Sequence, residues 1–336
     1  MKLKLVFVGL IGVLVFFIGL FLGNNIMSGI ALITALLFFA AHTISIPAYK
    51  SYAFTILIFA IIAAAMYFPA FFISYKEFEF KEMIVPLLML VMFGMGCNLS
   101  ANDFLLVLKE PKGVIVGLVC MYSVMPVMGF SLAHFSTLPP EIAAGIILVG
   151  CSPSGLASNI MAYISKANLA LSLTLTAIST LLAPLFTPVL MQKLAGAYLD
   201  INILDMFWSI SKIVIIPIVA GVIFNKIVKD GGSLVKRIMP IISKGGIIIL
   251  IAITTSLGRE SLLSVGLILI AVVIVHNLFG YTLGYYLARL MKLEKNSART
   301  IAFEVGMQNT GLASGLAVEM GKVATTGLAP ALFAHL

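Results

Sequence analysis

The sequence contains very little charge. Only 10% of its 336 residues are Asp, Glu, Lys or Arg, whereas a soluble domain carries about 25%. In contrast, 61% of the residues are hydrophobic and the mean hydropathy is +1.15. This composition excludes a soluble globular domain and predicts a protein that lies within the lipid bilayer.

The sequence also lacks the residues that several other classes of protein need. Its three cysteines, Cys97, Cys120 and Cys151, are scattered through apolar stretches, so they offer no disulfide framework or metal site. No pair of aspartates, no Ser and His arrangement and no HExxH zinc motif is present in the pattern of an intramembrane enzyme. We therefore predict no enzymatic activity, while composition alone leaves a receptor or a channel open.

The net charge of +8 is better explained by orientation in a membrane than by nucleic acid. Lys and Arg accumulate in cytoplasmic loops, and a cytoplasmic N-terminus places 14 of them in inner loops and flanks and 5 in outer ones. The inner set is Lys2, Lys4, Lys50, Lys109, Lys112, Lys166, Lys226, Lys229, Lys236, Arg237, Arg289, Lys292, Lys295 and Arg299, and the outer set is Lys76, Lys81, Lys193, Arg259 and Lys322. We predict a multi-pass protein of the cell (inner) membrane.

Eleven apolar stretches are long enough to be candidates for membrane spans, which need about 20 residues each. They lie at roughly 4–23, 27–47, 51–74, 83–98, 114–136, 141–163, 169–192, 206–225, 239–257, 262–288 and 300–320. A twelfth stretch begins near Thr325 and is too short to span unaided. The fold class is therefore an all-α integral membrane protein whose last helix looks incomplete.

Two of these stretches contain a repeated sequence. Residues 148–166 and 304–322 align without a gap at an offset of 156, with seven of 19 positions identical, including Gly-Leu-Ala-Ser in both copies. The copies fall in the sixth and eleventh stretches, and an odd spacing reverses the direction of the chain through the membrane. The pattern predicts an inverted repeat, which is a common plan of secondary transporters.

Each copy also has helix-breaking residues at its centre. Proline removes a backbone donor and glycine relaxes the backbone. A simple kink is one reading, but paired breaks at equivalent positions favour two functional unwound segments, near 150–158 and 306–314. The residues are Gly150, Pro153 and Gly155 in the first copy and Gly306, Asn309 and Gly311 in the second.

Glu304 is the acidic residue that lies deepest in an apolar stretch, and a buried charge there needs a cation or a proton. Oxygen-bearing side chains surround the two breaks and suit a hard cation. Each serine or threonine alone would more simply bond to its own helix backbone, so the interpretation depends on the whole group. Its members are Ser158, Asn159, Ser172, Thr176, Gln308, Asn309 and Thr310.

The strings ILVGCSPSGLASN, NLALSLTLTAISTLLAPLFTP and EVGMQNTGLASGLA resemble the bile acid:sodium symporter family, in its bacterial form, from about Ser51 to the C-terminus. The resemblance implies five helices plus five inverted helices, arranged as a panel domain and a core domain with two crossed broken helices. Residues 1–50 are then an additional N-terminal pair of helices, 51–200 the first repeat and 201–336 the second.

The same resemblance implies two sodium sites. The first maps to Ser158, Asn159, Ser172, Thr176 and Glu304. The second maps to Glu304, Gln308 and the carbonyls of Val305 and Met307, but Met121 occupies the place of a glutamine ligand, and a thioether binds sodium poorly. The substrate region maps to Ser154, Gly155, Leu156, Asn309 and Thr310, where Leu156 replaces a hydroxyl-bearing residue of the family pattern.

These observations predict sodium-coupled symport of a small organic anion, either bile-acid-like or a carboxylate or sulfonate metabolite, by alternating access. Na⁺ is the inorganic ion that this function requires. The alternative is a proton-coupled or antiporting carrier in which Glu304 binds a proton. The expected partners are the anionic substrate and the lipid bilayer, without nucleic acid, and the sequence leaves the oligomeric state open.

Overall fold

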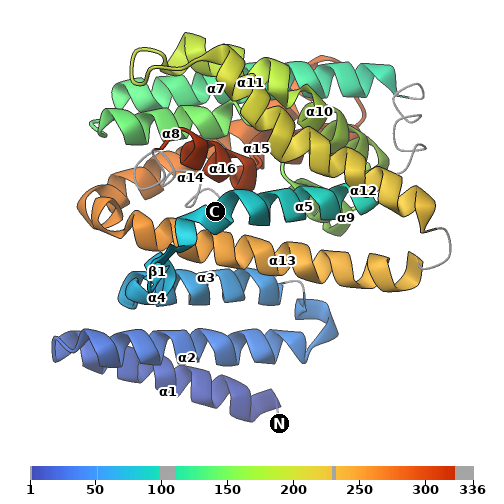
Figure 1. Ribbon diagram of the computed structural model, residues 1–336. Helices are drawn as coiled ribbons and strands as arrows, with labels where there is room; N and C mark the ends of the chain where they lie inside the picture. Colours follow the sequence, from blue (N-terminus) through green and yellow to red (C-terminus); the bar gives the residue numbers. More distant parts are fainter. Residues whose placement is uncertain (1, 51, 99–109, 229–231, 322–336) are drawn as a thin grey trace.

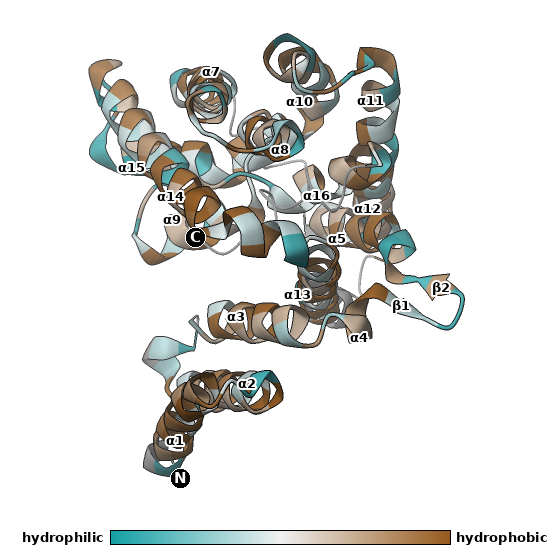
Figure 2. Ribbon diagram, turned by 90° about the vertical axis from the view of Figure 1, so that its left-hand side faces the viewer, coloured by the Kyte–Doolittle hydropathy of each residue, from teal (hydrophilic) through white to brown (hydrophobic). Residues whose placement is uncertain are grey.

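The N-terminal helices form a pair at one edge of the molecule. The structure, a computed structural model, describes residues 2–50, 52–98, 110–228 and 232–321. α1 (Lys2–Phe21) and α2 (Asn25–Ile44) are joined by a tight turn at Gly23, whose φ is +65°. Asn24 begins α2 by accepting a hydrogen bond from the Met27 N–H at 3.0 Å. The pair contacts the remainder of the protein mainly through α3 (Tyr52–Tyr67), as Figures 1 and 2 show.

A first bundle consists of α3, α5 (Ile84–Asn98), α12 (Ile216–Ile227) and α13 (Gly232–Leu257), which pack on one another. α5 and α12 approach closely, because a Cβ atom at Gly96 would lie only 2.2 Å from the Ile218 carbonyl oxygen. Between α3 and α5 the chain forms the short helix α4 (Ala70–Ile73) and a hairpin of β1 (Ser74–Tyr75) and β2 (Phe78–Glu79). Short 3₁₀ helices lie at Pro47–Tyr49 and Phe80–Met83.

A second bundle holds the candidate site. It consists of α7 (Pro111–Phe135), α8 (Pro140–Gly150), α9 (Leu156–Ile164), α10 (Leu169–Ala195), α14 (Arg259–Leu290), α15 (Lys295–Gly306) and α16 (Thr310–Glu319). α11 (Ile203–Ile210) and the π-helical turn Ser211–Ile215 lead from it to α12. α8 lies at its centre, and every residue from Ile142 to Gly150 is buried. An apolar core of this kind holds the neighbouring helices in fixed positions.

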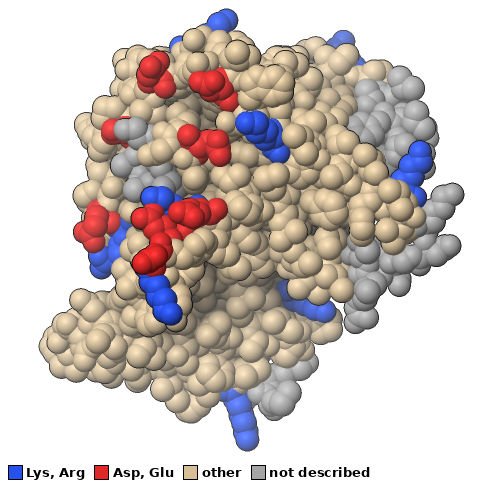
Figure 3. Space-filling model, in the orientation of Figure 1, with Lys and Arg blue, Asp and Glu red and all other residues tan. Residues whose placement is uncertain are grey.

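The described part of the chain contains seven helical spans that are long and apolar enough to cross a membrane. α3, α8 and the later part of α13 are apolar but shorter. Large apolar side chains are exposed along α1, including Phe7, Leu14 and Phe21, and most of the face in Figure 3 carries no charged residue. The protein is therefore a multi-pass membrane protein, as its composition predicts.

Most of the predicted stretches correspond to helices of the structure, with differences at their ends. The stretch at 51–74 is not one continuous helix. Its first helix ends at Tyr67, because Pro69 follows and lacks the N–H that a continuing helix needs. The stretches at 141–163 and 300–320 are each divided into two helices. The short stretch that begins near Thr325 lies outside the described residues.

Candidate cation and substrate site

The two divided helices cross where each is broken. α8 ends at Gly150 and α9 begins at Leu156, while α15 ends at Gly306 and α16 begins at Thr310. Both interruptions lie within the segments where glycine, proline and asparagine predict them, near 150–158 and 306–314. The crossing gathers two helix N-termini, which carry partial positive charge, and two C-termini, which carry partial negative charge.

Backbone hydrogen bonds join the two breaks. The Gly155 N–H donates to the Met307 carbonyl at 2.8 Å, and the Asn309 N–H donates to the Pro153 carbonyl at 2.7 Å. The two segments run antiparallel at this point. Gly155 is required by the approach of the chains, because a Cβ atom there would lie 2.8 Å from the Gln308 carbonyl oxygen.

Glu304, in the last turn of α15, is fully buried and faces three hydroxyl groups. Ser158 donates to its Oε1 atom at 2.6 Å, and Ser172 donates to the same atom at 2.5 Å. Thr176 donates to its Oε2 atom at 3.0 Å. The carboxylate is therefore in contact with two other helices, α9 and α10.

Asn159 completes this group, which we call the Glu304 oxygen cluster: Ser158, Asn159, Ser172, Thr176 and Glu304. The Asn159 amide oxygen lies 2.8 Å from the Ser172 hydroxyl and 3.3 Å from that of Thr176. Each hydroxyl has one proton, yet Ser172 and Thr176 both lie within reach of two acceptors. Each of these protons can serve only one of its two acceptors, so the carboxylate and amide oxygens keep lone pairs that a cation could use.

Gln308 lies at the break that follows α15. Its side-chain N–H donates to the Val305 carbonyl at 2.6 Å. Its Oε1 atom is buried and has no hydrogen-bond partner among the described residues. A buried acceptor without a partner is costly, so this oxygen is a candidate ligand for a bound ion.

Met121, in α7, is fully buried, in the same apolar cluster as Val124, Leu175 and Val305. The Met121 side chain is therefore surrounded by apolar side chains.

The Met307 carbonyl oxygen, a predicted ligand of the second sodium site, already accepts the Gly155 N–H, and the Ser154 hydroxyl lies 3.5 Å from this oxygen.

The residues of the predicted substrate region meet at the crossing. Ser154 is buried with its hydroxyl 3.1 Å from that of Ser158, so it faces the Glu304 oxygen cluster. Asn309 begins α16 by accepting the Leu312 N–H at 3.0 Å. Leu156 is 37% exposed, at the start of α9, and Thr310 is half-buried at the start of α16. These residues lie at or next to the two helix breaks.

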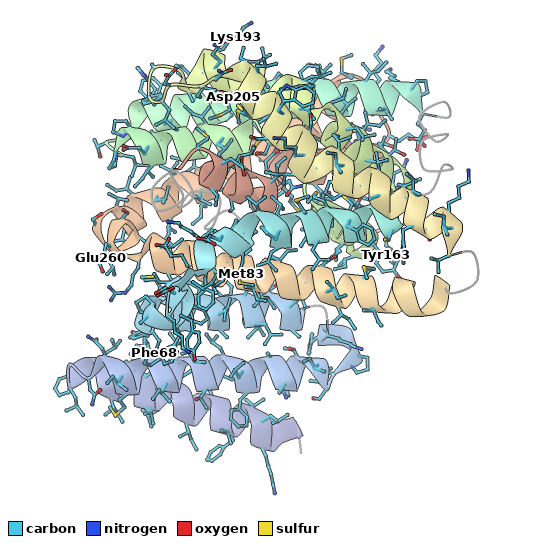
Figure 4. The ribbon with its side chains drawn as sticks, in the orientation of Figure 1. Phe68, Met83, Tyr163, Lys193, Asp205 and Glu260 are labelled. Carbon is cyan, nitrogen blue, oxygen red and sulfur yellow. The ribbon has the colours of Figure 1, made fainter. Side chains whose placement is uncertain are left out.

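α9 buries polar side chains and exposes apolar ones, which is the distribution expected of a helix in a membrane protein. Its buried side chains include Ser158 and Asn159, whereas Ile160, Tyr163 and Ile164 are exposed. Tyr163 is 71% exposed and projects at the end of the helix (Figure 4). An apolar open face therefore lies next to a polar helix start.

The sequence analysis did not identify three polar residues that adjoin the cluster. Asn168 begins α10, and Ser297 and Thr300 lie on α15, where Asn168 contacts both. The available signal was the position of Asn168 just before a long apolar run, which is typical of a helix N-cap. The contacts themselves depend on how α10 and α15 pack, so sequence gives no sign of them.

Comparison with known protein families matches residues 85–265 to the model of the Sodium Bile acid symporter family. The chain belongs to this family. An uncharacterized sodium-dependent transporter of Bacillus subtilis, YocS, is 40% identical over 80% of this chain and 81% of its own length. The human ileal sodium/bile acid cotransporter is 33% identical over 70% of this chain and 68% of its own length.

A chloroplast relative of Arabidopsis thaliana, the probable sodium/metabolite cotransporter BASS1, is 37% identical over 69% of this chain and 58% of its own length. Membership of the Sodium Bile acid symporter family makes the chain a membrane transporter and not an enzyme. The resemblance carried by the three sequence strings is thus confirmed.

Proposed function

We propose that the protein couples the movement of sodium to the import of a small organic anion by alternating access. The observation that carries the proposal is the Glu304 oxygen cluster, in which a fully buried carboxylate meets hydroxyl and amide oxygens from two other helices. Sodium is then a transported co-substrate and not a resident cofactor. The names of two relatives, a probable sodium/metabolite cotransporter and a sodium/bile acid cotransporter, support the proposal.

The charge of Glu304 requires a partner. Neither of the two salt bridges found among the described residues involves it, and an isolated charge deep in a membrane protein is costly. A hard cation prefers carboxylate, amide and hydroxyl oxygens. A sodium ion ligated by the cluster would neutralise the carboxylate and use the oxygen lone pairs that the hydroxyl protons leave unfilled.

A second sodium site is proposed beside the first, formed by Glu304, Gln308 and the carbonyls of Val305 and Met307. The partnerless Gln308 Oε1 atom supports it. Met121 stands where the family pattern has an amide oxygen, so this site has one ligand fewer. We infer that it binds sodium more weakly than the first.

The substrate is proposed to bind at the crossing, next to the starts of α9 and α16. Helix starts offer free N–H groups to an anion, and Asn309 and Thr310 add polar side-chain atoms. The exposed apolar face of α9, with Ile160 and Tyr163, would accept an apolar body. This combination favours an amphipathic anion, such as a carboxylate or sulfonate on an apolar frame.

An inverted repeat remains our proposal for the architecture, with 51–200 and 201–336 as its two halves and 1–50 as an added pair of helices. It is supported by the matched positions of the breaks and by their antiparallel contact. The first and second bundles would then be the panel and core domains. The protein would lie in the cell membrane with its N-terminus in the cytoplasm.

Cysteine labelling tests this topology. Lys166 follows α9 and is exposed, and its equivalent, Lys322, lies outside the described residues, so exposed Glu319 at the end of α16 replaces it. In a background whose three native cysteines are changed to alanine, we expect Lys166→Cys to react with an impermeant thiol reagent from the cytoplasmic side. Glu319→Cys should react from the opposite side. Reaction of both positions from one side would contradict the inverted repeat.

The second candidate function is proton-coupled or antiporting transport. It is favoured by the short contact of 2.5 Å between Ser172 and Glu304, because a protonated carboxyl group could take part in the same hydrogen-bonded network. The Glu304 carboxylate would then bind a proton in place of sodium. The two candidates differ in the gradient that drives uptake.

Uptake by the purified protein in liposomes distinguishes them. A ten-fold inward sodium gradient coupled to one ion stores about 1.4 kcal/mol, enough for about ten-fold accumulation of substrate without a membrane potential. We expect such a gradient to drive uptake of at least one anion from a panel of aliphatic carboxylates, sulfonates and steroid conjugates. A proton gradient, with choline replacing sodium, should not drive uptake of that anion. The opposite result would favour proton coupling.

A further inference from the structure

Asn168 lies outside the Glu304 oxygen cluster but is connected to the two helices that supply most of it. It is half-buried at the start of α10, one helical turn before Ser172. Thr300 lies on α15 one turn before Glu304, and is fully buried. Residues four apart share a helix face, so the pair Asn168 and Ser172 faces the pair Thr300 and Glu304.

The side-chain amide and the backbone carbonyl of Asn168 are both used in this arrangement. Its side-chain oxygen accepts the Leu171 N–H at 3.1 Å and so caps α10. Its backbone carbonyl accepts the Ser172 N–H at 3.1 Å and the Thr300 hydroxyl at 2.9 Å. The same carbonyl thus begins the hydrogen-bonding of α10 and joins α10 to α15.

The side-chain amide N–H groups of Asn168 make the remaining contacts. They donate to the two carboxylate oxygens of Glu110 at 3.0 and 2.9 Å, and to the Ser297 hydroxyl at 3.3 Å. Glu110 begins α7 but makes no cap hydrogen bond to it. Its carboxylate is directed instead to Asn168, so it joins the start of α7 to the start of α10.

We propose that Asn168, held by Glu110 and Thr300, is a positioning residue for the proposed sodium site. It fixes the rotation and the axial position of α10 relative to α15. The hydroxyls of Ser172 and Thr176 are thereby held within hydrogen-bonding distance of the Glu304 carboxylate. An oxygen ligand must be held within about 0.5 Å of its productive position, so ion binding is sensitive to such a setting. The contact matters for ion affinity although Asn168 does not touch the ion.

This inference rests on the proposed function, and a single titration examines both. The melting temperature of the purified full-length protein is measured against sodium concentration, with choline chloride holding the ionic strength constant. Two quantities are read. The first is the melting temperature without sodium, and the second is the half-maximal sodium concentration, at which half of the sodium sites of the folded protein are filled. The second is fitted from the way the shift grows with sodium concentration, since the stabilisation equals RT ln(1 + [Na⁺]/Kd). A purely structural contact would change the first quantity alone.

The test variant is Asn168→Asp, which keeps a capping oxygen but loses the amide donors and places a second carboxylate against Glu110. We expect the half-maximal sodium concentration to rise by about five-fold, the equivalent of one hydrogen bond. The double variant Asn168→Asp with Glu110→Gln restores an amide and carboxylate pair with the roles exchanged. It should return the half-maximal concentration towards the wild-type value.

Asn202→Asp is the matched control, because Asn202 also caps a helix, α11, by accepting the N–H groups of Leu204 and Asp205. It should leave the half-maximal sodium concentration unchanged. Thr300→Val, which removes only the hydroxyl bonded to Asn168, serves if the first variant does not fold, and should also raise that concentration.

The outcomes are distinguishable. A wild-type protein that sodium does not stabilise at all overturns the proposed sodium site and this inference with it. A wild-type response combined with an unaltered half-maximal concentration in Asn168→Asp, or in Thr300→Val where that variant is used, overturns only the positioning role. Equal effects of Asn168→Asp and Asn202→Asp would also overturn it.

Discussion

Replacing Glu304 with alanine is expected to abolish the stabilisation of the protein by sodium. A ligand that binds only the folded state at about 100 times its dissociation constant stabilises it by about 2.7 kcal/mol. Glu304 supplies the only formal negative charge of the Glu304 oxygen cluster, and its two oxygens contact Ser158, Ser172 and Thr176. Without that charge the remaining hydroxyl and amide oxygens would not compensate a sodium ion for its lost hydration.

The measurement is the shift in melting temperature between choline chloride and sodium chloride at equal ionic strength. Glu294→Ala is the matched control, because Glu294 immediately precedes the same helix, α15, but is exposed and makes no cap hydrogen bond. The control should keep the full sodium shift. A shift of wild-type size in Glu304→Ala would show that sodium binds elsewhere.

The residues of the proposed sodium site could be identified in the sequence because they are chemically conspicuous in an apolar chain. Glu304 lies in a stretch where an unpaired charge has a high energetic cost, and the two helix breaks are marked by Gly150, Pro153 and Gly306. The structure brings Ser158, Ser172 and Thr176 to the carboxylate, as the resemblance to the family implied.

The remaining features depend on packing between helices that are distant in sequence. Nothing in the sequence indicates that the Asn309 N–H would bond to the Pro153 carbonyl, or that the Thr300 hydroxyl would bond to the Asn168 carbonyl. Ser154 is a similar case. The resemblance assigned it to the substrate region, and the structure places its hydroxyl 3.1 Å from that of Ser158.

The exact ends of the helices could also not be predicted from the sequence pattern. Hydropathy reports where a chain can be buried, and it does not distinguish a continuous helix from one that is interrupted or extended. α13 begins at Gly232, seven residues before the start of the apolar stretch at 239–257, because its first turns include charged residues that hydropathy assigns to a loop. The π-helical turn at Ser211–Ile215 is likewise invisible in composition.

Met121→Gln is the second substitution for which we expect a large effect. The effect concerns the cooperativity with which sodium promotes substrate binding. Met121 is fully buried in an apolar cluster that includes Val305, whose carbonyl is a proposed ligand of the second sodium site. With a thioether there, the second site relies on Glu304, Gln308 and two carbonyls. We expect substrate binding by the wild-type protein to depend on sodium with a Hill coefficient of about one, because one site fills well below the concentration that the other needs.

A glutamine at position 121 would add an amide oxygen to the second site. Two sodium ions, ionised Glu304 and a monoanionic substrate sum to zero charge, which is favourable in the membrane interior, whereas one sodium ion leaves the same set at minus one. We therefore expect Met121→Gln to raise the Hill coefficient towards a value of about two. The same variant should melt at a lower temperature than the wild type without sodium, because its buried amide then lacks partners.

Titration of sodium against binding of a transported anion measures this effect, with Met125→Gln as the matched control. Met125 is also fully buried and lies one turn further along α7, in the same apolar cluster. Its thioether sulfur would lie 2.7 Å from a Cβ atom at Gly280, which places it against α14. The control should lose stability without gaining cooperativity. A wild-type coefficient already near two, unchanged by Met121→Gln, would mean that Gln308 and the carbonyls of Val305 and Met307 hold the second ion without help, and that Met121 only packs.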